Sequence, residues 1–294
     1  MTILQDEPGV DINSSPPAQV GRRRHRLNRL LFVLLAVVSL VWIFLPLAMA
    51  VLWSLVDSSS PWSYPDLFPR KLSFDRWSEL WRNTSLPTAI ANSYRLAPVV
   101  GVVAISLAMP TAYAFGRLEF RGKQIAQVLS LLPIVLPGFA VAIFFSSVLL
   151  RFGIFDRYIG ILVGHVVLFM PYAIRILTVS FGQIPQDLID AARDMNAGPI
   201  TRFRTIFAPL MLPGIASAFI IIFILSIEEF ALAFILGSPD FTTIPTVLFS
   251  FLGFNFVRPN AAVVSLILVI PNAAILLTLE RLLTSVGLSS GSKG

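Results

Sequence analysis

The chain has 294 residues, of which 56% are hydrophobic and only 13% are charged, and its mean hydropathy is +0.80. A soluble domain carries about a quarter charged residues, so this composition excludes a soluble globular protein and indicates an integral membrane protein. The absence of cysteine excludes disulfides and thiolate metal sites, and two histidines are too few for a metal cluster.

The sequence is strongly basic, with a pI of about 10.2. In a soluble protein this would favour a nucleic-acid partner. Here the arginines stand at the ends of apolar runs, as in the cluster from Arg22 to Arg29 that precedes the first run. Because basic residues at such positions set membrane orientation, we expect no nucleic-acid partner.

Residues 1–29 are polar, proline-bearing and then basic, a composition typical of a disordered tail. Six long apolar runs follow and predict membrane-spanning helices, so residues 30–286 should form a transmembrane domain and residues 287–294 a short second tail. The predicted spans are residues 30–56, 88–116, 125–150, 161–181, 208–237 and 261–286. Basic residues are more numerous on the side of the N-terminus, which places both termini in the cytoplasm.

The segment between the fourth and fifth predicted spans, residues 182–207, is polar and patterned like a docking element. Pro185 suits the first position of a helix, and Asp187 and Asp190 favour the positive end of the helix dipole. One helix face is expected to carry Leu188, Ala191, Ala192 and Met195. Asn196 and Gly198 should end this helix, and a second helix from about residue 200 should lead into the fifth span.

This segment resembles the Glu-Ala-Ala, three residues, Gly, nine residues, Ile-x-Leu-Pro loop of bacterial type I ABC importer permeases. Asp190-Ala191-Ala192 fits its start, Asn196 stands at the Gly, and Ile206 and Pro209 are in register. Asp for Glu keeps the charge, and Asn is the next-best residue to Gly for a left-handed backbone. Ala208, which replaces Leu, is the weaker match.

The resemblance implies an all-α membrane protein with six transmembrane helices, a core over residues 88–286 and a cytoplasmic coupling helix between helices four and five. In that family the coupling helix fits a cleft on a separate ATPase subunit. The implied coupling residues here are Asp187, Asp190, Ala191, Ala192, Met195, Asn196, Ile206 and Pro209. An Ala192→Arg change is expected to abolish docking and leave the fold intact.

The resemblance also implies the rest of the assembly: two ATPase subunits, a second related permease subunit and an extracytoplasmic solute-binding protein, in the bacterial inner membrane. This chain itself is not expected to be an enzyme or to hold a cofactor. Gly116 and Gly122-Lys123 lack the spacing of a phosphate-binding loop, and Gln124 follows the lysine where Ser or Thr is needed. ATP and Mg²⁺ should therefore bind the partner ATPase.

Two neighbouring carboxylates, Glu228 and Glu229, lie inside the fifth predicted span. A charge in the hydrocarbon region must face a partner, a cavity or water. On a continuous helix the two would point about 100° apart, so we expect one to line the translocation pathway and the other to face a basic group or a partner subunit. Arg95, at a similar depth in the second span, is the candidate partner and is counted with the two glutamates as a translocation-pathway residue. His165 is interpreted as a packing residue or a helix-to-helix hydrogen bonder, with a place in the pathway lining as the alternative.

The stretch from Glu228 to Pro245 resembles spermidine/putrescine-type permeases and implies a polyamine or related cationic or amino solute. The same importer class carrying a sugar, a phosphonate or another anionic solute is the alternative, and a purely structural charge pair explains the glutamates equally well. An ion-coupled secondary transporter is disfavoured because no inverted pair of interrupted helices is visible. A membrane assembly factor would leave both glutamates unexplained.

Overall fold

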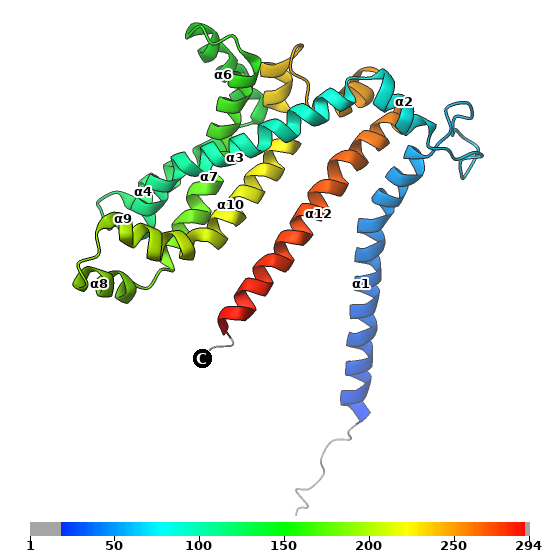
Figure 1. Cartoon of the computed structure of the whole chain (residues 1–294). Helices are drawn as coiled ribbons and strands as arrows, with labels where there is room; N and C mark the ends of the chain where they lie inside the picture. Colours follow the sequence, from blue (N-terminus) through cyan, green and yellow to red (C-terminus); the bar gives the residue numbers. More distant parts are fainter. Residues whose placement is uncertain (1–18, 292–294) are drawn as a thin grey trace, which may run out of the picture. The chain divides into compact units, whose positions relative to one another are not determined.

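The computed structural model describes the backbone of residues 19–291 and the side chains of residues 28–278 and 281. Over these residues the chain is helical, with one isolated β-bridge between Val56 and Leu72. The elements, most of them labelled in Figure 1, are α1 (Gln19–Ser54), α2 (Asp75–Asn83), α3 (Leu86–Arg117), α4 (Lys123–Leu129), α5 (Leu132–Val135), α6 (Gly138–Arg151), α7 (Arg157–Gly182), α8 (Gln186–Asp194), α9 (Pro199–Arg202), η1 (Phe203–Phe207), α10 (Ala208–Glu228), η2 (Ala233–Gly237), α11 (Ile244–Phe249), η3 (Ser250–Phe254) and α12 (Arg258–Gly291).

The number of candidate membrane spans agrees with the prediction. Five described helices are long and apolar enough to cross a membrane, and a bent pair brings the total to six if it counts as one span. Of the predicted N-terminal tail, residues 1–18 lie outside the described residues and residues 19–29 form the start of α1. Residues 287–291 of the predicted second tail belong to α12, and residues 292–294 are not described.

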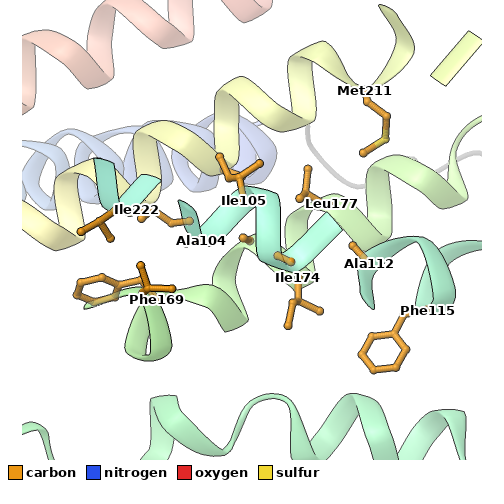
Figure 2. Close-up of a cluster of buried hydrophobic side chains, with 14 of the residues drawn as sticks. Ala104, Ile105, Ala112, Phe115, Phe169, Ile174, Leu177, Met211 and Ile222 are labelled. Carbon is orange, nitrogen blue, oxygen red and sulfur yellow. The ribbon is translucent and has the colours of Figure 1, made fainter. Parts of the chain in front are cut away.

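Helices α3, α7 and α10 form the core of the transmembrane domain. Their contact surfaces carry small residues, among them Ala104, Ala108, Ala112 and Ala173, all fully buried, and larger side chains such as Leu177 and Ile222 fill the space between them (Figure 2). Small residues allow helix backbones to approach closely, which is the main source of packing energy where lipid removes the hydrophobic driving force.

At Gly116 the backbones of α3 and α7 approach each other closely. A Cβ at this position would lie 2.7 Å from the Cβ of Phe181 and from the carbonyl oxygen of Thr178. The C-terminal ends of α3 and α7 therefore meet, and the start of α10 lies beside the end of α7, since Ser180 of α7 adjoins Gly214 of α10. This common end carries the connection from α7 to α10, which contains α8 and α9.

The third predicted span is not one straight helix. Residues 123–151 form α4, α5 and α6, and the two halves are bent by 95°. The bend falls at Leu136 and Pro137, both with extended backbone. Proline lacks the N–H that would continue the helix and disfavours a helical backbone in its predecessor, so the span predicted over 125–150 is sharply bent at Pro137, one of the prolines expected to kink the spans.

The fifth predicted span is also interrupted. The helix predicted from about residue 200 is α9 with η1, which lead without a break into α10, and the span then ends at Glu228. Glu229 has φ −69° and ψ 128°, an extended conformation, and the helical path resumes only over residues 231–237. The predicted helix over 208–237 is therefore broken at the second glutamate.

Candidate coupling and translocation sites

The short helix predicted between spans four and five is α8, and it has one inward and one outward face. Ile189 and Ala192 are buried, with 4% and 6% of their surface exposed. Leu188 is 47% and Met195 76% exposed, and Ala191 is exposed as well. Ala192 therefore packs against this chain, and the prediction that it shares an outward face with Leu188, Ala191 and Met195 was wrong.

An arginine that is not among the predicted coupling residues holds α8 in place. Arg117, the last residue of α3, donates to the carbonyl oxygens of Ile184 (2.9 Å) and Phe181 (3.5 Å) and to Oε1 of Gln186 (2.7 Å). It thus joins the end of α3 to the end of α7 and to the first turn of α8. A basic residue in the last turn of a span, close to the unpaired carbonyls of a neighbouring helix end, was the available signal.

A surface network continues from this arginine along α8. Gln186 Nε2 donates to Oδ1 of Asp190 (3.0 Å), and Arg193 donates to the same oxygen (2.9 Å). Both side chains of the Asp190–Arg193 pair are about half exposed, so the pair adds little stability by itself. Asp190 of the family signature is consequently held by its own helix and remains accessible on the surface.

The end of α8 has the backbone that the sequence predicted for the Gly position of the signature. Asn196 has φ 56°, in the left-handed region, and Ala197 N donates to the carbonyl oxygen of Ala192 (2.9 Å). Asp187, in the first turn of α8, and Pro209, in the first turn of α10, are exposed. Ile206 is half-buried and packs against the core, so among the predicted coupling residues Ala192 and Ile206 face inward.

Glu229, the second glutamate of the pair, is surrounded by groups of this chain's own fold. Glu229 accepts hydrogen bonds from the backbone N–H groups of Leu232 (2.8 Å) and Ala233 (3.0 Å), and so caps the helical segment that follows the break. Its Oε2 lies 3.3 Å from Nε2 of His165, which is fully buried, and Nδ1 of the same histidine lies 2.9 Å from Oγ of Ser226. His165 therefore links α7 to α10, as interpreted from the sequence.

The first glutamate has a different environment. Glu228, the last residue of α10, is exposed, and its Oε1 accepts a hydrogen bond from Nδ2 of the buried Asn272 on α12 (3.2 Å). Arg95 is exposed, and among the described residues it forms no ion pair with either glutamate. The predicted Arg95–Glu229 pair is therefore wrong, because the break at Glu229 turns that carboxylate toward α7.

Comparison with known proteins assigns the chain to a family. Residues 104–285 match the family described as binding-protein-dependent transport system inner membrane component. Relatives include the trehalose transport system permease protein SugB of Mycobacterium tuberculosis, 29% identical over 82% of this chain and 90% of that protein. The spermidine/putrescine transport system permease protein PotC of Haemophilus influenzae is 24% identical over 72% of this chain and 82% of that protein.

Solved structures show the same fold. A bacterial ABC transporter involved in the import of the acidic polysaccharide alginate has a chain that matches with a TM-score of 0.72 and 16% identity, covering 88% of this chain and 97% of the other. The MetNI methionine ABC transporter matches with a TM-score of 0.58 and 19% identity over 71% of this chain and 98% of the other. The chain belongs to the binding-protein-dependent inner-membrane components, the non-catalytic, multi-pass permease subunits of ABC importers.

Proposed function

We propose that α8 is the helix through which this permease receives the movement of a separate ATPase subunit. The supporting observation is its outward face: Leu188, Ala191 and Met195 are exposed on a helix whose other face is buried. Small and apolar side chains on an otherwise polar surface helix suit a protein interface. The proposal places α8 and both chain termini in the cytoplasm and Mg²⁺-bound ATP on the partner.

The contacts of α8 explain how such a movement would reach the pathway. Arg117 ties the start of α8 to α3 and α7, and the continuous path through α9 and η1 ties its end to α10. A displacement of α8 is thus applied to all three core helices. The complete importer would contain two ATPase subunits, a second related permease and a solute-binding protein, and would alternate between inward-open and outward-open states that ATP and the binding protein stabilise differently.

For the solute, we infer a sugar rather than a polyamine. Glu229 is occupied by backbone N–H groups and by His165, so of the two carboxylates only Glu228, beside Asn272, is free to meet a solute. A carboxylate next to an amide suits hydroxyl groups, and it would repel an anion. A sugar therefore fits this site better than a polyamine dication, which needs two free carboxylates. The similarity to a trehalose permease supports the same solute class.

An aromatic cluster that begins at Phe230, two residues after Glu228 in the sequence, fits the same solute class. Phe230 lies 5.3 Å from Phe234 and 4.7 Å from Phe249, measured between ring centroids. All three rings are half-buried. Aromatic rings offer flat apolar faces that complement the C–H faces of a sugar ring, whereas they add nothing specific for a phosphonate.

The coupling proposal is tested by co-purification of the ATPase subunit with this chain. Ala191→Arg puts a bulky charge on the outward face of α8 and should remove the ATPase while the permease stays folded. Thr201→Arg is the matched control, because Thr201 is exposed in the same loop but lies on α9, and it should retain the ATPase. Equal retention by both variants would contradict the proposal. Ala192→Arg is unsuitable, since burial of Ala192 means that the substitution would disrupt α8 itself.

The solute is tested by uptake of labelled disaccharides, putrescine and a phosphonate, with wild type and Glu228→Gln. The glutamine keeps the hydrogen-bonding groups and removes the charge. We expect disaccharide uptake that falls by no more than a few fold in the variant. Putrescine uptake that depends on the charge of Glu228 would overturn the sugar assignment and leave the coupling proposal intact.

A further inference from the structure

A cavity of about 600 Å³ lies behind α8, between this helix and the ends of the core helices. Its lining comes from five elements and one adjoining residue, so it is formed by the same packing that holds α8 in place. The lining residues are Met109, Pro110, Tyr113, Arg117, Leu118, Phe181, Gln186, Ile189, Arg193, Pro199, Arg202, Phe203 and Phe207. The translocation proposal does not use this cavity, which lies at the opposite end of α10 from Glu228.

The polar part of the lining is strongly basic. Three arginines line the cavity, and no acidic residue does so among the residues that the structure describes. Arg117 already donates to two carbonyl oxygens and Gln186, and Arg193 is paired with Asp190. Arg202 differs: its Nε is buried and has no hydrogen-bond partner. A desolvated guanidinium donor without an acceptor is unfavourable, so an anion is the group that this site lacks.

The remaining wall is apolar and aromatic. The ring of Tyr113 lies edge-on to Phe181 (centroids 5.4 Å apart) and 6.1 Å from Phe207, and Met109 and Pro110 continue this wall along α3. Basic groups on one side and an apolar wall that runs along a membrane-spanning helix on the other suit an amphiphile better than a small hydrophilic anion.

We propose that this cavity binds a phosphate group, with Arg202 as its principal ligand and Arg117 and Arg193 completing a positively charged rim. The planar fork of an arginine matches phosphate oxygens and forms charge-assisted hydrogen bonds with them. The phosphate comes from the headgroup of an anionic lipid or from a free phosphate ion. The inference rests on the proposed cytoplasmic placement of α8, because basic pockets on that side of the membrane meet anionic lipids.

A bound phosphate would strengthen the connection between α8 and the core. It would link Arg202 on α9 to Arg117 on α3 and Arg193 on α8, and so add α9 to the existing connection between Arg117 and Gln186 of α8. The ligand would thereby stabilise the loop through which ATPase movement is transmitted, without touching the outward face of α8.

The test uses the full-length chain, with the subunits that co-purify, in nanodiscs of phosphatidylcholine alone or mixed with phosphatidylglycerol. Lipid retained after exchange is measured by native mass spectrometry, and the thermal midpoint of the permease is measured in parallel. Arg202→Gln is compared with Arg204→Gln, a matched loss of one charge two residues away on an exposed side chain outside the cavity. Inorganic phosphate added to phosphatidylcholine discs tests the free-ion source.

We expect wild type and Arg204→Gln to retain phosphatidylglycerol and to gain thermal stability from it. Arg202→Gln should bind it about tenfold more weakly, as expected for loss of one charge-assisted hydrogen bond, and Arg202→Lys, which keeps the charge, should bind with an intermediate affinity. If inorganic phosphate alone raises the thermal midpoint of wild type and does not raise that of Arg202→Gln, the site is supported with a free ion as its ligand.

Equal weakening in Arg202→Gln and Arg204→Gln would overturn the proposal, because it would reflect general attraction to a basic surface. No response to either phosphate source would overturn it as well. The amount of ATPase in the same preparations is a separate readout. A wild-type chain that retains phosphatidylglycerol through Arg202 but carries no ATPase would refute the coupling proposal and leave the phosphate site standing.

Discussion

Glu228 and Glu229 are adjacent in the sequence, yet the structure predicts opposite results when each is replaced by alanine. Glu229→Ala should destabilise the permease, because its carboxylate holds two backbone N–H groups and faces His165. Glu228→Ala should leave stability almost unchanged and reduce transport, because this exposed side chain has one contact, with Asn272.

The size of the difference follows from the contacts. A hydrogen bond to a charged acceptor contributes about 1.5–3 kcal/mol to stability, and a buried donor left without its partner costs a comparable amount. Leu232 and Ala233 are both fully buried, so loss of the two bonds from Glu229 should lower the free energy of unfolding by about 3–6 kcal/mol. Glu228 accepts a single hydrogen bond from a neutral donor at 3.2 Å. Glu228→Ala should therefore lower the free energy of unfolding by about 1 kcal/mol or less.

The assay is thermal and denaturant unfolding of both variants in the same nanodiscs, followed by solute uptake. Glu229→Gln is the graded control: its single carbonyl oxygen accepts one of the two N–H groups, so its stability should lie between wild type and Glu229→Ala. A Glu229→Ala protein that unfolds at the wild-type temperature but fails to transport would refute the reasoning, since Glu229 would then serve the solute and not the fold.

Three further predictions follow from other parts of the chain. Asn196→Val should destabilise the end of α8 by about 1–2 kcal/mol because a β-branched residue is strained at φ 56°, whereas Asn196→Gly should be neutral; limited proteolysis of the 186–209 loop measures both. Arg117→Gln should loosen α8 and lower the fraction of ATPase retained, unlike the exposed control Arg121→Gln. In the loop after α1, hydrogen bonds from Ser59, and then Lys71, hold the pKa of Asp57 below its ordinary value of 3.8. The ionised form therefore stabilises the fold at neutral pH, and this contribution is lost as the pH falls below about 4 through the lower folded-state pKa; Asp57→Asn should be less stable at pH 7 and show a smaller loss on acidification, measured by unfolding across that range.

The membrane-spanning elements could be predicted from the sequence because hydropathy is a sum over many residues. Runs of apolar residues mark α1, α3, α7, α10 and α12 whatever the details of packing. The left-handed backbone at Asn196 could be predicted for a similar reason. The preference of Asn for this conformation is a local property of the residue type and does not depend on packing. The family assignment rested on such local features, and the comparisons confirm it.

The side-chain directions on α8 could not be predicted in the same way. The apolar residues of α8 offer two possible faces, about one residue apart, and their spacing alone predicted the face without Ile189. The choice is decided by Arg117, which fixes the first turn of α8 through Gln186 and Ile184, a contact between residues more than sixty positions apart. Such long-range contacts leave no periodic signal in the sequence.

The break in the fifth span is the step that assigns separate roles to the two glutamates. A continuous helix would leave Glu229 facing its surroundings with its own backbone already bonded, and neither carboxylate could cap anything. With the extended backbone at Glu229, the N–H groups of the next turn become free, and the carboxylate binds them together with His165. Glu228 is then the last residue of α10 and lies beside Asn272, directly before the extended backbone of Glu229. Because Glu229 stabilises the interruption, its loss should alter the position of Glu228, so transport by Glu229→Gln should fall only as far as its stability does.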